Sequence, residues 1–353
     1  MKITFPYWGN YTIAFNALCR KLGLDFVPPE KTNPRSIEAG AKISPDMYCF
    51  PLKTNVGNYL SAIEKGADTI FMVTSLGGSC RLRYYGAIQE KVLTETGHDV
   101  TFISFDQTPI DIYKKVKKIS GASFGRIMEA ARFFLQTLWL IENLERRANF
   151  LRPREKRKGE TDEILRQGFL KLEKIDSFGK LDSFKKEINQ KLSQIDTDED
   201  KKIPKVGLIG EIYTVTDGAI NFGVEEKLGK EGIEVHREMD ITYHLKKRIF
   251  PWKDWTIQRK INPYLKSTVG GHGRDAIYEM LEYVKKGFDG IVHLLPFGCM
   301  PETTIRPILQ KIHLESGIPF LSLSLDEQIA EAGINTRIEA FVDVVKNYYN
   351  QEK

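Results

Sequence analysis

The sequence has few cysteines for its length, and none of them lies close to another. Its 353 residues include only four, Cys19, Cys49, Cys80 and Cys299, and no two form a CxxC pair. This spacing argues against a disulfide framework and lacks the paired ligands typical of structural zinc sites. A chain this long buries an adequate hydrophobic core without such links.

Long hydrophobic runs are also missing. No apolar stretch reaches the ~18 residues that a membrane-spanning helix needs. The longest candidate, Ile127–Leu140, is interrupted by Glu129, Arg132 and Gln136. The first residues lead directly into a predicted strand, with no signal-peptide pattern. We therefore expect a cytoplasmic protein with no membrane partner.

A strong charge excess is the third feature that the sequence lacks. Lys and Arg number 52 against 47 Asp and Glu, a net charge of +5. A nucleic-acid-binding protein usually has a larger basic surplus, so we expect no nucleic-acid partner. The basic run from Arg146 to Lys158 has two interpretations: a solvated surface, which is the ordinary one, or a patch that binds an anion or a partner.

The pattern along the chain is that of an α/β protein with two halves. Short apolar runs predicted as strands, such as Asp25–Val27, Asp68–Val73, Glu234–Arg237 and Gly290–Leu295, alternate with helical patterns such as Val56–Lys65 at both ends of the chain. This alternation is typical of parallel sheets. The middle is charged and helical throughout. We predict an N-terminal α/β lobe over residues 1–108, a helical insert and linker over 109–202, and a C-terminal α/β lobe over 203–353.

The two halves repeat one local arrangement. Gly66-Ala67-Asp68 and Gly287-Phe288-Asp289 each follow a predicted helix and precede a predicted strand. Each strand then leads into a loop with one cysteine, Cys80 or Cys299. Ligands in open α/β sheets bind beyond the carboxyl ends of strands. Both cysteines are thus expected where chemistry is usually found.

Three of the cysteines lie among glycines and prolines. Cys49 is followed by Phe-Pro-Leu-Lys53, Cys80 follows Gly77-Gly78-Ser79, and Cys299 lies within Pro296-Phe-Gly-Cys-Met-Pro301. Such settings allow the close backbone approach that suits an inorganic sulfide cluster. Spacing alone leaves open the alternative of three buried, inert thiols. Cys19, inside a predicted helix, is interpreted as a core residue.

These segments resemble a known family. Cys49-Phe-Pro-Leu-Lys53, Gly-Ser-Cys80-Arg81 and the run from Gly287 to Glu302 are similar to the cysteine segments of the 2-hydroxyacyl-CoA dehydratase D-component family. They are most similar to its CoA-protein-activase-like, activator-associated branch. The resemblance implies two flavodoxin-like or Rossmann-like lobes with parallel sheets and a metal cluster in the cleft between the lobes.

The resemblance also implies a cofactor and partners. The cofactor would be one oxygen-sensitive 4Fe-4S cluster held by Cys49, Cys80 and Cys299. Its remaining iron would be open or have an exogenous ligand. Electrons would come from an ATP-dependent 4Fe-4S activator protein, because this chain has no P-loop of its own. A homodimer, or a heterodimer with a related subunit, in an anaerobic organism is expected.

Three functions remain open from the sequence. In the first, the protein reduces or dehydrates a small substrate, such as a CoA thioester, at the open iron. In the second, it is a non-catalytic electron-relay or cluster-carrying subunit of a larger reductase or dehydratase. In the third, it is a zinc-binding or metal-free scaffold, with His272 or His293 as the fourth zinc ligand.

Four further residues are candidates for the cleft. His272 lies in a glycine-rich loop. It is either an acid or base in the cleft or a plain turn residue. Glu211 follows a predicted strand and either faces the cleft or anchors a helix. Lys53 and Arg81 flank two cysteines, where a cation stabilises a reduced cluster unless it pairs with an acidic residue. Glu302 is expected to cap a helix.

Overall fold

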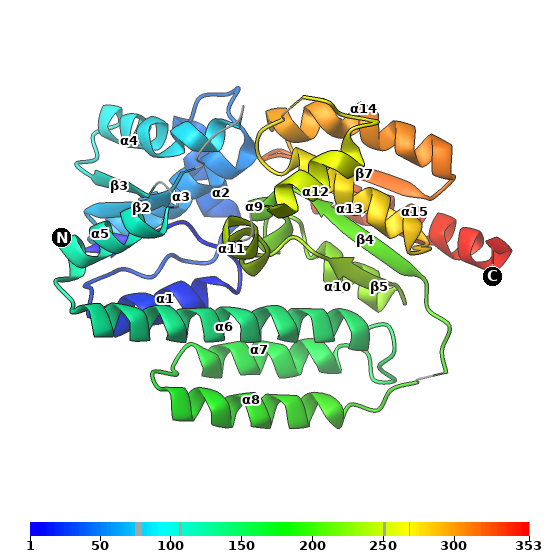
Figure 1. Ribbon diagram of the computed structural model, residues 1–353, viewed down its shortest axis with the longest axis horizontal. Helices are drawn as coiled ribbons and strands as arrows, with labels where there is room; N and C mark the ends of the chain where they lie inside the picture. Colours follow the sequence, from blue (N-terminus) through cyan, green and yellow to red (C-terminus); the bar gives the residue numbers. More distant parts are fainter. Residues whose placement is uncertain (75–79, 106–107, 199, 250–251, 268, 353) are drawn as a thin grey trace.

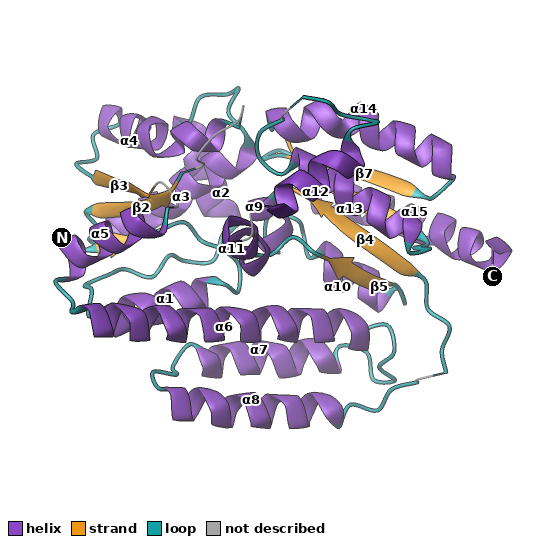
Figure 2. Cartoon of the chain, in the orientation of Figure 1, coloured by secondary structure: helices purple, strands orange, loops and turns teal. Residues whose placement is uncertain are grey.

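The computed structural model describes residues 1–74, 80–105, 108–198, 200–249, 252–267 and 269–352. Figure 1 shows two α/β lobes side by side, with long helices packed beneath them. Each lobe has a parallel sheet, and helices make up most of the remainder (Figure 2). The predicted two-lobe α/β fold is confirmed.

The N-terminal lobe is built on a three-stranded sheet. Its strands are β1 (Ile3–Thr4), β2 (Thr69–Val73) and β3 (Thr101–Phe105), all parallel in the order β1-β2-β3. The segment Asp25–Val27, predicted as a strand, contributes one isolated bridge from Phe26 to Ile3. The helices of this lobe are α1 (Thr12–Leu22), α2 (Pro34–Ile43), α3 (Phe50–Glu64), the short 3-10 helix η1 (Arg81–Tyr84) and α4 (Tyr85–Glu95).

The C-terminal lobe has a four-stranded parallel sheet. Its order is β5 (Glu234–Arg237), β4 (Lys205–Gly210), β6 (Gly290–Pro296) and β7 (Phe320–Leu325). Every residue of β6 is buried, as expected for a central parallel strand covered on both faces. The helices of this lobe are α9 (Ile212–Thr216), α10 (Val224–Lys230), α11 (Ile241–Ile249), α12 (Trp252–Ile261), α13 (Gly273–Lys285), α14 (Met300–Ser316) and α15 (Glu331–Glu352).

Each face of this second sheet has its own hydrophobic core. Leu208 belongs to the core that includes Ile338 and Val342 of α15, whereas its neighbour Ile209 belongs to the core with Ile277 of α13. Successive side chains of a strand point to opposite faces, so this division follows from the pleat. The sheet is therefore doubly covered, and only its ends are available for a site.

A layer of helices joins the two lobes. It comprises α5 (Pro109–Ser120), α6 (Phe124–Leu151), α7 (Glu160–Leu172) and α8 (Phe178–Ser193). Helix α6 contacts α1 and α5 at one end and β5, α10 and α11 at the other. In its C-terminal half, Glu145 accepts hydrogen bonds from Tyr11 (2.8 Å) and Arg237 (2.6 Å). One carboxylate thus links the N-terminal lobe, the helical layer and the C-terminal lobe.

The basic run that starts at Arg146 is not a simple solvated surface. Arg146 pairs with Asp240, Arg152 is 7% exposed and pairs with Asp162, and Arg154 donates to Glu234 at 2.6 Å. The interpretation as a solvated surface does not hold for Arg152 and Arg154, whose side chains are 8% and 12% exposed and pair with residues of other elements. Arg146 is exposed, although it too is paired. Among the described residues, no helix has the length and apolar character to cross a membrane.

Candidate functional site

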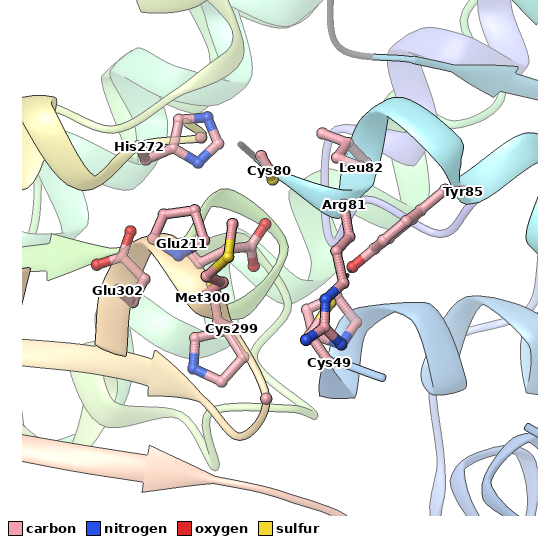
Figure 3. Close-up of a pocket in the computed structure, with 15 residues that line it drawn as sticks. Cys49, Cys80, Arg81, Leu82, Tyr85, Glu211, His272, Cys299, Met300 and Glu302 are labelled. Atoms are coloured by element: carbon pink, nitrogen blue, oxygen red, sulfur yellow. Dashed lines mark hydrogen bonds between the residues drawn. The ribbon is translucent and has the colours of Figure 1, made fainter. Parts of the chain in front are cut away.

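Most of the predicted site residues line one pocket between the lobes, and Lys53 is the exception. Strands β4 and β6 of one sheet and β2 of the other lead into the segments that line it. Figure 3 shows this pocket with its cysteines and carboxylates. Its lining residues are Cys49, Pro51, Cys80, Arg81, Leu82, Tyr85, Glu211, Gly271, His272, Pro296, Gly298, Cys299, Met300, Pro301 and Glu302.

Five helices begin at this pocket. The residue in front of each helix is a chemically active one: Cys49 for α3, Cys80 for η1, Glu211 for α9, His272 for α13 and Cys299 for α14. The first turn of a helix presents free N–H groups and the positive end of its dipole. The pocket is therefore a place where backbone groups favour negative charge. The Gly77-Gly78-Ser79 segment ahead of Cys80 lies outside the described residues.

Two glycines let the backbone approach the cysteines. A Cβ atom on Gly271 would lie 3.4 Å from the Sγ atom of Cys80. A Cβ atom on Gly298 would lie 3.2 Å from the Cα atom of Cys49, and Gly298 has a positive φ of 73°. These contacts join segments that are far apart in the sequence, so the glycines bring the three cysteines to one place.

The thiols of Cys49 and Cys299 are buried and that of Cys80 is partly buried, and all three disfavour the charged form. Burial raises the pKa of Cys49, raises that of Cys80 to about 12 and raises that of Cys299 well above its ordinary value. The negative charges of Glu211 and Glu302 add to this effect at Cys299. A positive metal centre reverses this balance, because a coordinating thiol loses its proton.

Two carboxylates line the pocket beside the thiols. Glu211 caps α9, its Oε2 atom accepting from the backbone N–H and the hydroxyl of Thr214, both at 3.0 Å. Burial and the charge of Glu302 raise the pKa of Glu211 to about 7. Glu302 is fully buried, and its Oε2 atom lies 2.9 Å from Nε2 of His293. Glu302 lies in the first turn of α14; Cys299, rather than Glu302, occupies the cap position.

His272 lines the pocket as a neutral side chain. Burial lowers its pKa to about 3, and the neighbouring His244 ring, 4.5 Å away between centroids, acts in the same direction. A neutral imidazole donates one hydrogen bond and accepts another, so it is able to serve as a donor or a ligand here.

The two cations that flank cysteines have different surroundings. Arg81 lines the pocket, donates to the backbone oxygen of Met47 and lies over the ring of Tyr48. Lys53 is not among the lining residues; it is 3% exposed and pairs with Glu327. Of the two, only Arg81 is placed to influence a group in the pocket.

Tyr85 is a pocket residue that sequence reasoning did not find. Its hydroxyl contacts the Sγ atom of Cys49, and the side chain is buried at 3% exposure. No sequence signal marks this tyrosine, because it lies inside an ordinary helical pattern. Either atom can donate in this contact, and toward a deprotonated sulfur the hydroxyl would be the donor.

The donor set of the pocket consists of three thiols, the residue type that binds iron–sulfur clusters. Among the described residues, no group of three or more His, Cys, Asp or Glu side chains is placed to hold one metal ion. In a cubane, by contrast, each thiolate binds a different iron. Three thiols at helix N-termini match that chemistry. The free space between the side chains is about 20 Å³, so a cluster requires lining side chains such as Met300 to move.

Fold and site together define a two-lobed α/β protein with three thiols in its interlobe pocket. Residues 4–75 match the family model described as the CoA enzyme activase uncharacterised domain, and residues 261–345 match that of the 2-hydroxyglutaryl-CoA dehydratase D-component. These two matches support the resemblance of the chain to the 2-hydroxyacyl-CoA dehydratase D-component family and to its activase-associated branch.

The matched ranges cover part of the pocket. Cys49 lies in the first range, and His272 and Cys299 lie in the second. Cys80, Arg81 and Glu211 lie outside both ranges and join the pocket through the fold. A comparison with curated proteins finds no match.

Proposed function

We propose that this protein holds one 4Fe-4S cluster on Cys49, Cys80 and Cys299, with the remaining iron open or bound to an exogenous ligand. The observation that carries the proposal is the convergence of these three thiols, each in front of a helix, on one pocket. The two family matches at either end of the chain support it.

The surrounding residues have defined roles in this proposal. When bound, the cluster supplies one-electron chemistry and an open coordination position. The three helix N-termini and Arg81 offset the negative charge of a thiolate-bound cluster. The hydroxyl of Tyr85 contacts the sulfur of Cys49 and would donate to it once that sulfur is deprotonated. Glu211, whose pKa is about 7, is able to hold or release a proton near neutral pH at the edge of the same pocket.

The electron source in this proposal is an ATP-dependent 4Fe-4S activator, and the substrate is a small molecule such as a CoA thioester that is reduced or dehydrated at the open iron. One observation favours the alternative of a non-catalytic electron relay or cluster carrier. The pocket has free space for a single water molecule, so a thioester requires the lobes or their loops to open.

The first test is the metal content of protein purified under strictly anaerobic conditions. We expect about four iron and four acid-labile sulfide per chain, with an EPR signal of a reduced cubane after dithionite treatment. Zinc in place of iron, or no cluster after attempted reconstitution, would overturn the proposal.

Substitution of the cysteines tests the ligand assignment. We expect Cys49→Ser, Cys80→Ser and Cys299→Ser each to lose the cluster. Cys19→Ser is the matched control, because Cys19 is a buried thiol in α1 outside the pocket, whose pKa burial raises to about 12. Loss of the cluster in the Cys19 variant alone would contradict the assignment.

A third experiment separates the enzyme from the relay. The cluster-loaded protein is mixed with an activator and ATP, and product formation from a 2-hydroxyacyl-CoA is measured. Turnover by this mixture supports the enzyme. Oxidation of the reduced cluster only when a larger catalytic subunit is added, together with stable association, supports the relay.

A further inference from the structure

A second cavity lies where the three parts of the molecule meet. Its volume is about 270 Å³, and it is separate in its lining residues from the thiol pocket. Its walls come from the N-terminal lobe, from α6 of the helical layer and from β5 with the segment that follows it. The lining residues are Tyr11, Glu142, Arg146, Asn149, Phe150, Glu234, Val235, His236, Arg237, Glu238 and Asp240.

The cavity is rich in carboxylates. Four acidic side chains line it against two arginines. Both arginines are already paired: Arg146 with Asp240, and Arg237 with Glu145 and Glu225. No lining arginine is therefore left for an anionic ligand. The negative charge of the walls favours a cation instead.

Among the residues that the structure describes, two of the four carboxylates form no ion pair. Asp240 pairs with Arg146, and Glu234 pairs with Arg154 and His236. Within the described part of the chain, no ion pair is formed by Glu142 or by Glu238. Glu142 accepts hydrogen bonds from the backbone and the hydroxyl of Thr242, both neutral donors. Glu238 lines the same cavity and is exposed.

Burial of a charged Glu142 carboxylate is unfavourable without a cation beside it. This side chain is 1% exposed, and burial together with the charge of Asp240 raises its pKa to about 7, although the charge of Arg146 and the hydrogen bonds from Thr242 act to lower it. A buried carboxylate normally has a charged partner or loses its charge. A positive group in the cavity would supply the partner that Glu142 lacks.

We propose that this cavity binds a small organic cation with ammonium or guanidinium groups, held by the carboxylates of Glu142 and Glu238. The volume equals that of roughly nine water molecules, which suits a short linear diamine or guanidino-amine. A single metal ion is not the expected ligand, since no described group of three acidic, His or Cys side chains is placed for one.

The site lies on the contacts that hold the lobes together. Tyr11 and Arg237 line facing walls of the cavity, and both donate hydrogen bonds to Glu145. A bound cation would therefore stabilise the folded arrangement of all three parts. This inference does not depend on the cluster, because its lining residues and the thiol pocket have no member in common.

The test is calorimetric titration of the full chain, purified without added amines, with 1,4-diaminobutane and with 4-guanidinobutylamine. The neutral analogue 1,4-butanediol and the anion succinate are the ligand controls. We expect the two cations to bind and the two controls not to bind. Glu142→Gln and Glu238→Gln should each weaken binding by roughly tenfold or more, the loss expected for one charge-assisted contact.

Glu231→Gln is the matched control, since Glu231 is an exposed acid at the end of α10 that does not line the cavity. Its affinity should stay within about twofold of the unchanged protein, whereas a general loss of negative charge would weaken all three variants alike. The exposed Glu238 variant keeps the test valid if Glu142→Gln fails to fold. Binding of succinate alone, absence of binding by both cations, or equal affinity in the Glu238 variant would overturn the proposal.

Discussion

Each thiol of the pocket is subject to two opposing electrostatic effects. A helix N-terminus stabilises a negative charge by about 0.3–1 kcal/mol. Burial acts in the other direction and prevails, because the pKa of Cys80 is about 12 even though Cys80 precedes the first turn of η1. The helix ends therefore do not create free thiolates. They favour an anionic group once a metal centre has displaced the protons.

The hydroxyl of Tyr85 makes a residue-scale prediction possible. Tyr85→Phe removes the O–H donor to Cys49 while keeping the ring. Hydrogen bonds to ligand sulfur favour the reduced, more negative cluster. We expect the midpoint potential, measured by EPR-monitored titration, to fall by roughly 60 mV, a tenfold change in the reduction equilibrium. Tyr59→Phe is the control, because that hydroxyl donates to Met72 instead; an equal shift in both variants contradicts the assignment.

Gly298 allows a second prediction, with Gly317 as its matched control. Both have a positive φ, 73° and 71°, but a Cβ on Gly298 would lie 3.1 Å from the backbone oxygen of Tyr48, whereas nothing lies within 4 Å of one on Gly317. We expect Gly317→Ala to cost about 1–2 kcal/mol of unfolding free energy, from backbone conformation alone. Gly298→Ala should cost more and reduce cluster content. Urea unfolding and iron analysis of both variants check this, and equal costs contradict it.

The sequence predicted most of the strands, because each is a short apolar run beside a glycine turn. Glu234–Arg237 was predicted with the bounds that β5 has, and Gly290–Leu295 differs from β6 by one residue. Helices near the site were predicted too short. Helix α3 was expected from Val56 but begins at Phe50, since Pro51 is well accommodated in a first turn. Helices α2, α11 and α12 were not predicted.

The contact between the helical layer and edge strand β5 supports an element-scale prediction. Burial acts to raise the pKa of Glu234, but hydrogen bonds from His236 and Arg154 outweigh it and hold the pKa at about 2. Arg154→Met removes the guanidinium and keeps the aliphatic stem. We expect a loss of about 2–3 kcal/mol in unfolding free energy at neutral pH. Lys156→Met is the control and should cost about 0–1 kcal/mol, because the pair of Lys156 with Asp196 is exposed.

The pH dependence of this loss has a defined sign. The pKa of Glu234 is lower in the folded chain than its unfolded value of about 4.3. The stability that it contributes is therefore present above that unfolded value and disappears as the pH falls toward 2. The difference between the unchanged protein and Arg154→Met should shrink in urea unfolding curves taken from neutral pH down to about pH 3. A difference that stays constant over this range contradicts the pair as its source.

At the scale of the whole molecule, the candidate site was predicted only in part. Cys49, Cys80 and Cys299 were identified from their local settings, which a single sequence displays. The partners that complete the pocket were not, because they are distant along the chain: Tyr85 reaches Cys49, and Gly271 approaches Cys80 from the other lobe. Such contacts depend on how two separately folded sheets face each other.

The lobe interface carries the last prediction. Phe50 of α3 is 2% exposed and packs in the core of the C-terminal lobe, and its N–H donates to the backbone oxygen of Phe297 at 3.0 Å. Phe50→Ala should cost about 3–5 kcal/mol and loosen this contact. Leu165→Ala is the control, because Leu165 is equally buried but belongs to the core of the helical layer.

The measurement is alkylation by iodoacetamide of cluster-free protein, with each cysteine followed by mass spectrometry. In Phe50→Ala we expect Cys49 and Cys299 to react roughly tenfold faster than in Leu165→Ala, since only the first variant favours local opening of the lobes. Cys19, buried in α1 away from the interface, serves as the internal reference in both. Equal acceleration of all three cysteines would mean that the chain opens only by global unfolding, and that access to the pocket requires more than a movement of the lobes.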